Sequence, residues 1–166
     1  MQNPLITEIT DAFPVDPVPE AGEILYNEQP GYKGSFPAED ELQEIKSFFG
    51  NRPWNSISPH DVFRFRHALS FFSCRAFAYY TAAWIVCSLQ DSEAVDTADT
   101  DLLFELTRKS PDCWTEKQQQ VICKWLTHFR GQLNECSCGF GGLSKERTSD
   151  FEKAMENLHC ASDART

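Results

Sequence analysis

Four residues near the C-terminal end have side chains that zinc accepts as ligands. Cys136 and Cys138 flank a serine, and His159 and Cys160 are adjacent. Structural zinc sites usually space their ligands as C-x2-C and H-x3–5-H, which neither pair matches. Adjacent residues of a helix also point about 100° apart, so His159 and Cys160 cannot easily face one ion. We therefore expect no metal and no other cofactor, and oxidation of exposed thiols at Cys136 and Cys138 is the alternative chemistry.

A cysteine nucleophile is the second chemistry that the residue types suggest. Cys74 begins a predicted helix, where the helix dipole lowers a thiol pKa, and His60 or His67 could act as its base. The surrounding letters FFSCRAF match no catalytic signature and are typical of a protein core. The glycines of residues 138–142 fit neither a phosphate loop nor a dinucleotide-binding turn. Because the sequence has no catalytic constellation, we expect a protein without enzymatic activity.

A basic cluster flanked by aromatic residues is the third candidate. Guanidinium and aromatic side chains can stack on a ligand ring or bind an acidic group. The candidate ligand-binding residues are Trp54, Arg64, His67, Arg75, Tyr79 and Tyr80. The alternative is that the arginines, Arg66 included, neutralise acidic segments of the same fold. The tyrosine hydroxyls would then bond to carboxylates such as Asp61.

The charge of the chain limits its partners. Its 25 acidic and 15 basic residues give a net charge of −10 over 166 residues. Residues 1–45 carry ten acidic side chains against Lys33, and residues 91–112 carry seven against two basic ones. Residues 46–90 carry five basic side chains against Asp61. An acidic surface repels phosphate backbones and anionic lipids, so we expect a basic protein partner, with charge for solubility alone as the alternative.

One stretch predicts the architecture. Residues 62–90 contain no acidic residue, and residues 76–89 are apolar or aromatic on nearly every side of a helix. Such a helix is normally buried. We therefore predict an all-α, single-domain, orthogonal or irregular bundle of about six helices over residues 1–166, built around a central helix at about 74–90 that Ser73 caps.

The remaining helices are predicted from their caps and apolar spacing. Asn3-Pro4, Ser58-Pro59 and the capping box at Thr115 are the clearest starts. Residues 14–36 form a proline- and glycine-rich connection with a brief extended piece at 23–26, and residues 161–166 form a frayed tail. The acidic stretch 91–101 is predicted as a connection. The predicted helices lie at 3–13, 37–49, 58–69, 74–90, 101–109, 115–133 and 149–158.

The location follows from three observations. The longest apolar run has 14 residues, fewer than the roughly 20 that a spanning helix needs. The first residues include acidic side chains and no basic segment, unlike a secretory signal. The seven cysteines are an odd number, and Cys74, Cys87 and Cys123 fall in apolar helical patterns. We therefore expect a cytoplasmic protein with unpaired thiols.

Several short motifs of the sequence resemble those of a known family. The strongest likeness is ALSFFS at 68–73 followed by F-x-YY at 77–80, with Trp54 and Asp61 before them and WT-x-x-QQ at 114–119 after them. Over roughly residues 38–130 the chain resembles an uncharacterised bacterial family of cytoplasmic proteins. It departs from that family at 81–83, which reads TAA in place of Leu-Pro-Ala, so the kink that the proline would give is not expected. The resemblance implies a bacterial cytosolic helical domain and transfers no activity.

Two classes of function follow. The first is a non-catalytic interaction module, such as an immunity or antitoxin-like protein that binds a basic partner. The alternative is a small-molecule-binding protein or hydrolase that uses a cleft near Trp54, Arg64, His67, Tyr79 and Tyr80. The sequence leaves the partner, the ligand and the oligomeric state open.

Overall fold

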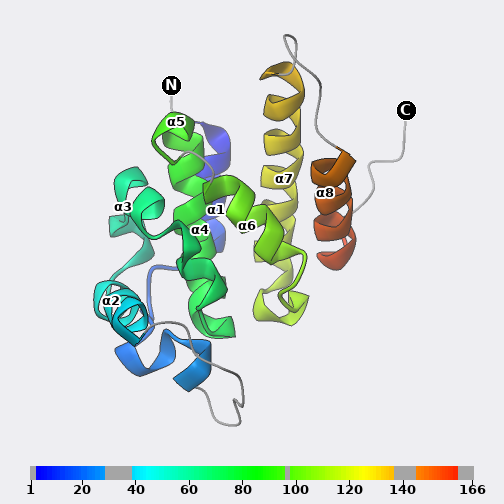
Figure 1. Cartoon of the computed structure of the whole chain (residues 1–166). Coiled ribbons are helices and arrows are strands. Elements are labelled where there is room, and N and C mark those ends of the chain that lie inside the picture. Colours follow the sequence, from blue (N-terminus) through cyan, green and yellow to red (C-terminus); the bar gives the residue numbers. More distant parts are fainter. Residues whose placement is uncertain (1–2, 29–38, 96–97, 137–144, 161–166) are drawn as a thin grey trace. The chain divides into compact units, whose positions relative to one another are not determined.

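The computed structural model describes residues 3–28, 39–95, 98–136 and 145–160, and the predicted tail at 161–166 lies outside them (Figure 1). Over these residues the regular structure is helical, with one isolated β-bridge, so the all-α prediction is confirmed. None of the described helices combines the length and the hydropathy that crossing a bilayer requires. The chain gathers into two compact units, residues 1–102 (unit 1) and residues 103–166 (unit 2).

The buried helix has the predicted bounds. Helix α4 (Cys74–Gln90) begins where Ser73 Oγ accepts a hydrogen bond from the backbone N–H of Ala76 at 3.1 Å. Ten of its 17 residues are buried, including every residue from 80 to 85. Successive residues of a helix are about 100° apart, so six consecutive buried residues mean that α4 is covered on every side.

Within unit 1, α4 contacts α1 (Pro4–Ala12), α3 (Pro59–Arg64) and α5 (Ser92–Val95) (Figure 1). Helix α1 begins as predicted, with Asn3 Oδ1 accepting a hydrogen bond from the backbone N–H of Leu5 at 3.0 Å. Its apolar side chains are buried because they recur on one face, at Leu5, Ile6, Ile9 and Phe13.

Helix α3 is shorter than predicted. The Ser58–Asp61 capping box is present, with the backbone N–H of Ser58 donating to Asp61 Oδ2 at 3.0 Å. The helix ends at Arg64, and the 3-10 helix η4 (Arg66–Ser70) continues the chain to the predicted end at residue 69. A 3-10 helix has three residues per turn, so it brings residues three apart onto one face. Phe65 and Ala68, three residues apart, are both buried.

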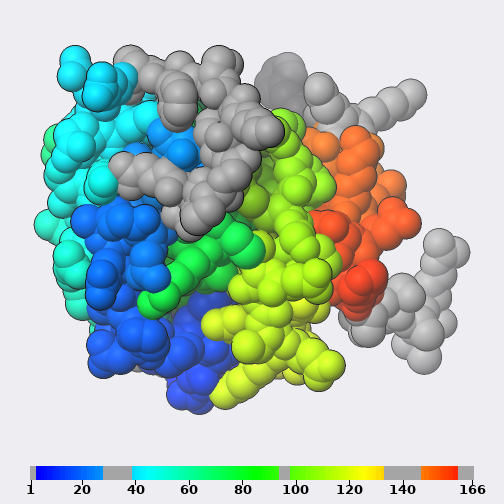
Figure 2. Space-filling view, turned by 90° about the horizontal axis from the view of Figure 1, so that it is seen from below, coloured from blue at the N-terminus to red at the C-terminus, as the bar shows by residue number. Residues whose placement is uncertain are grey.

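The connection after α1 runs along α2 (Glu39–Phe49). Of the predicted connection 14–36, the structure describes 14–28, which contains the 3-10 helices η1 (Ala21–Glu23) and η2 (Tyr26–Glu28). The extended piece predicted at 23–26 is reduced to a single bridge between Leu25 and Phe72. Helix η1 contacts α2, and the two colours, blue and cyan, meet on one face of unit 1 in Figure 2. A Cβ at Gly50 would lie 2.9 Å from the Cα of Ala21, so this approach requires a glycine.

The acidic stretch at 91–101 is partly helical. It holds the short helix α5 and the start of α6 (Ala98–Leu106), which begins three residues earlier than predicted and spans the boundary between the two units. Asp99 and Asp101 lie in the first turn of α6. Carboxylates there favour the positive end of the helix dipole, so residues interpreted as a charged connection begin a helix.

Unit 2 contains the antiparallel pair α7 (Glu116–Cys136) and α8 (Lys145–Asn157) (Figure 1). The predicted capping box begins α7, with the backbone N–H of Gln118 donating to Thr115 Oγ1 at 3.3 Å. Helix α8 begins four residues before the predicted Ser149. The Phe129 and Phe151 rings, with centroids 5.5 Å apart, join the two helices through their apolar faces.

The expectation of unpaired thiols is wrong for four cysteines. Cys123 and Cys160 form a disulfide, and Cys74 and Cys113 are also disulfide-bonded. The Cα atoms of Cys123 and Cys160 are 5.6 Å apart, the separation that a disulfide needs. The two residues lie 37 positions apart, so the helical patterns that place each one gave no indication that they meet. Over the described residues Cys87 is a free, buried thiol, as expected.

Phe49 is the centre of the aromatic core of unit 1, and this gives a first prediction. Its ring lies within 6 Å, centroid to centroid, of five others, those of Phe48, Phe65, Phe72, Tyr80 and Trp84. Phe49→Ala leaves a cavity among these rings, so we expect urea unfolding to show a loss of about 3–5 kcal/mol.

The neighbouring Phe48 is the matched control, because it has the same side chain but is half-buried. Phe48→Ala is expected to cost less than half as much. Equal losses for the two variants would contradict the central place of Phe49.

Candidate functional site

Trp54, the first predicted ligand-binding residue, belongs to the core. It begins the 3-10 helix η3 (Trp54–Ser56) and is 2% exposed. Its indole Nε1 donates to the backbone carbonyl of Phe13 at 3.2 Å. The side chain therefore joins η3 to the end of α1 and is not presented to a ligand.

The two tyrosines also serve the fold. Tyr80 Oη lies 2.5 Å from the Phe49 carbonyl oxygen and 2.8 Å from that of Arg52, and it donates to them. Tyr79 Oη donates to the Val15 carbonyl at 2.5 Å. Burial raises the pKa of both hydroxyls, so they stay protonated as donors. The prediction that they bond to carboxylates such as Asp61 is wrong. Their acceptors are backbone carbonyls at or just beyond the ends of α1 and α2, where carbonyls lack partners within the helix.

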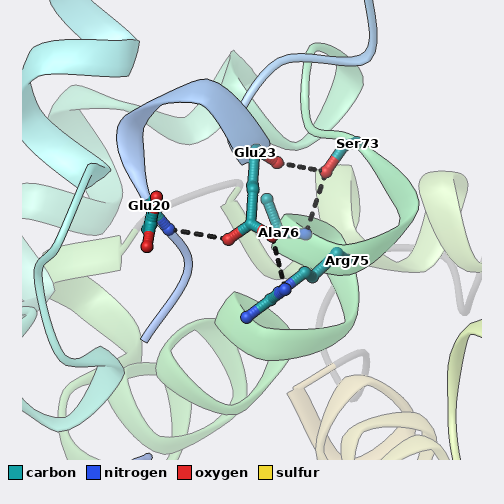
Figure 3. A network of polar contacts seen from close by, with 5 residues as sticks. All are labelled: Glu20, Glu23, Ser73, Arg75 and Ala76. Atoms are coloured by element: carbon teal, nitrogen blue, oxygen red, sulfur yellow. Dashed lines mark hydrogen bonds and ion pairs between the residues drawn. The ribbon is translucent and has the colours of Figure 1, made fainter. Parts of the chain in front are cut away.

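Arg75 forms an ion pair with Glu23, at the N-terminal end of α4 (Figure 3). The backbone carbonyl of Glu23 also accepts a hydrogen bond from Ser73 Oγ at 2.5 Å, and its carboxylate accepts one from the backbone N–H of Glu20 at 2.9 Å. Ser73 in turn caps α4 through Ala76. The network joins η1 to the start of α4 and uses Arg75 inside the fold.

Arg64 is held in the same way. Its guanidinium contacts Glu44 of α2 at 2.5 Å and lies over the Phe65 ring, 4.9 Å from the centroid. Phe65 packs on Phe48, and the Arg52 guanidinium lies over the Phe48 ring, 3.9 Å from its centroid. The alternative in which arginines neutralise acidic residues of their own fold therefore describes Arg64 and Arg75.

The recess beside Arg64 brings together two of the six predicted residues. Arg64 and His67 border a recess of about 140 Å³, and Trp54, Arg75, Tyr79 and Tyr80 do not line it. Small-molecule sites usually have about 300–1,000 Å³. The recess is lined by Glu41, Glu44, Ile45, Arg64, Phe65, His67 and Ala68.

A larger hollow, which the sequence did not predict, lies in unit 2 between α7 and α8. This groove has a volume of about 620 Å³, and the Cys123–Cys160 disulfide is part of its wall. Both cysteines are partly exposed. The apolar stripe of α7 predicted the buried face of that helix but said nothing of which segment would lie beside it. The other lining residues are Glu116, Gln119, Gln120, Lys124, Thr127, Met155, Leu158 and His159.

The candidate metal ligands do not form a site in the described part of the chain. Cys160 is bonded to Cys123, so its sulfur is not a thiolate. The side chain of Cys136 and the whole of Cys138 lie outside the described residues. Among the described residues no group of three or more His, Cys, Asp or Glu could hold a metal ion. The disulfide-bonded Cys74 likewise cannot act as the predicted nucleophile in this state.

The charge divides sharply between the two units. Residues 1–102 carry 16 acidic and six basic side chains, a net charge of −10. Residues 103–166 carry nine of each. The whole net charge of the chain therefore belongs to unit 1, while the groove of about 620 Å³ belongs to a unit without net charge.

No protein-family model matches the chain. No curated protein and no solved structure matches it either. The resemblance to an uncharacterised bacterial family therefore stays a prediction, and the functional argument depends on the charges and contacts described above.

Replacing Tyr80 by phenylalanine tests whether the tyrosines are structural. Tyr80→Phe removes the hydroxyl that donates to the carbonyls of Phe49 and Arg52, so we expect thermal or urea unfolding to show a loss of about 1–3 kcal/mol. Tyr79→Phe is the matched variant. Its carbonyl partner lies in a half-buried environment that water can reach, so a smaller loss is expected.

A ligand-binding role for the tyrosines would leave the free energy of unfolding nearly unchanged in both variants. If both variants unfolded within about 0.5 kcal/mol of the wild type, the hydroxyls would be free for a ligand and the structural assignment would be wrong.

Proposed function

We propose that the chain is a non-catalytic, acidic interaction module that binds a basic protein partner through unit 1, in the manner of an immunity protein or an antitoxin. The supporting observation is the confinement of the entire net charge of −10 to residues 1–102. A surface with one dominant sign attracts a partner of the opposite sign and speeds its association.

The pairing inside unit 1 strengthens this argument. Arg64 and Arg75 are engaged with Glu44 and Glu23, so two of the six basic residues are already matched one to one with acidic residues. Each such pair cancels one charge of either sign, so the net charge of −10 in unit 1 is unchanged by it. The first turn of α2 presents three consecutive exposed carboxylates, Glu39, Asp40 and Glu41.

The small-molecule alternative has less support. Trp54, Tyr79 and Tyr80 are engaged with backbone carbonyls, and Arg64 with an acidic side chain of the same fold. The recess at Arg64 and His67 is smaller than an ordinary ligand site. A cytoplasmic location and a bacterial source stay predictions that accompany the proposal.

Neutralising charge in one unit at a time tests the proposal on the full chain. The unit 1 variant combines Glu39→Gln, Asp40→Asn and Glu41→Gln. The control combines Glu116→Gln, Glu152→Gln and Glu156→Gln, which removes three exposed carboxylates from unit 2. With a lysine-rich peptide as the probe, we expect the unit 1 variant to raise the dissociation constant at least about fivefold and the control by less than about twofold.

Salt gives the second measurement. Exposed charges are screened over about 8 Å at physiological ionic strength and about 3 Å at 1 M, so the wild-type affinity should fall steeply as NaCl is added. Equal effects of the two triple variants, or an affinity that does not change with salt, would contradict binding through the charge of unit 1. Affinity purification from the host, with the wild type and the two triple variants as baits, then identifies a natural partner. That partner is a basic protein that the wild type and the unit 2 control retain and the unit 1 variant does not.

A further inference from the structure

The end of α8 is tied to α7 by a covalent bond that lies within reach of solvent. Beyond Asn157 the chain turns at His159, whose backbone adopts the left-handed φ of 52°, and returns Cys160 to Cys123 on α7. The backbone N–H of Cys160 donates to the carbonyl of Met155 at 2.9 Å. A non-glycine residue seldom adopts a positive φ, so the turn at His159 needs surrounding contacts to hold it.

The disulfide is exposed to reductants, and the free thiol of unit 1 is not. Cys123 and Cys160 are partly exposed and line the groove of about 620 Å³. Lys124, the sequence neighbour of Cys123, lines the same groove, and a cation close to a sulfur favours its thiolate form. Cys87, in contrast, is 1% exposed, and burial raises its pKa to about 12. The accessible redox chemistry of the described groove is therefore that of the Cys123–Cys160 pair.

Other contacts hold most of α8 without the disulfide. Asn157 Nδ2 donates to the Leu106 carbonyl at 2.8 Å and to the Lys109 carbonyl at 2.9 Å. Phe151 and Ala154 are completely buried, and the Phe151 ring packs on Phe129. Opening the disulfide would therefore leave α8 in place as far as Asn157 and release only the turn that follows.

We propose that Cys123 and Cys160 form a redox switch that holds or releases the wall of the α7–α8 groove. Disulfides in reducing compartments are usually transient and redox-sensing, which makes an exposed pair in an expected cytoplasmic protein a candidate sensor. The proposal does not depend on the charge of unit 1, so it stands or fails separately from the proposed function.

The reaction is a thiol–disulfide exchange with a dithiol as the reductant. One thiolate of the dithiol attacks a sulfur of the pair, the Cys123–Cys160 bond breaks, and the other cysteine leaves as a thiolate that takes up a proton. The second thiol of the reductant then displaces the protein sulfur, giving a cyclic disulfide of the reductant and two protein thiols. Two electrons and two protons pass from the dithiol to the protein.

Hydrogen exchange on the full chain tests the switch. We expect dithiothreitol to speed exchange of the amides of residues 158–160 at least about tenfold, because their hydrogen bonds belong to the released turn. Amides of residues 121–130, in the middle of α7, should change by less than about twofold. Reoxidation with oxidised glutathione should restore slow exchange at 158–160.

A double variant separates this disulfide from the bonded Cys74 and Cys113, which dithiothreitol also reduces. Cys123→Ser with Cys160→Ser should exchange rapidly at 158–160 with or without the reductant, and Cys87→Ser should behave like the wild type. The proposal is overturned if reduction leaves 158–160 unchanged. It is also overturned if residues 121–130 lose protection together with them, or if the double variant does not fold, because the bond would then be a structural requirement and no switch.

Discussion

The fold of unit 1 depends on the burial of α4 on every side. A hydroxyl buried on that helix needs a hydrogen-bond partner within the protein, because an unpaired buried hydroxyl costs free energy. Thr81 and Ser88 do so by donating to carbonyls of their own helix, those of Phe77 and Ile85. Tyr80 instead donates to carbonyls at and beyond the end of α2, and this fixes where α2 meets α4. The surrounding elements are therefore positioned by what the buried helix needs.

The requirement for internal hydrogen-bond partners explains why residues that suggested a ligand site in the sequence have structural roles. Aromatic residues with one polar atom, next to arginines, are also what a small core uses to join its connections. Helix ends leave carbonyls without partners, and Trp54 and Tyr79 donate to the carbonyls of Phe13 and Val15, just beyond α1. Arg75 likewise neutralises Glu23 beside the start of α4. Residue types alone cannot distinguish ligand binding from a structural role. The role depends on which group each side chain contacts in the folded protein.

Local patterns predicted most of the helices, and long-range encounters could not be predicted. The caps at Asn3, Ser58, Ser73 and Thr115 depend on residues at most three positions away, so their spacing in the sequence is enough. The nearly uniform apolar character of residues 76–89 likewise predicted the buried helix. The pairing of Cys123 with Cys160 depends instead on the packing of α8 on α7, and neither the disulfide nor the groove has a signal in the spacing of residues.

The division of charge gives the two units different physical means of responding to their surroundings. Attraction through the excess carboxylates of unit 1 is weakened by salt, because mobile ions screen exposed charges within about 8 Å at physiological ionic strength. A covalent bond at the edge of the groove in unit 2 is insensitive to salt and responds to the supply of thiols. A disulfide and two protonated thiols are both uncharged, so reduction of the Cys123–Cys160 pair leaves the long-range field of the chain nearly unaltered. Under the two proposals, capture of a basic partner and opening of the groove can therefore be controlled independently.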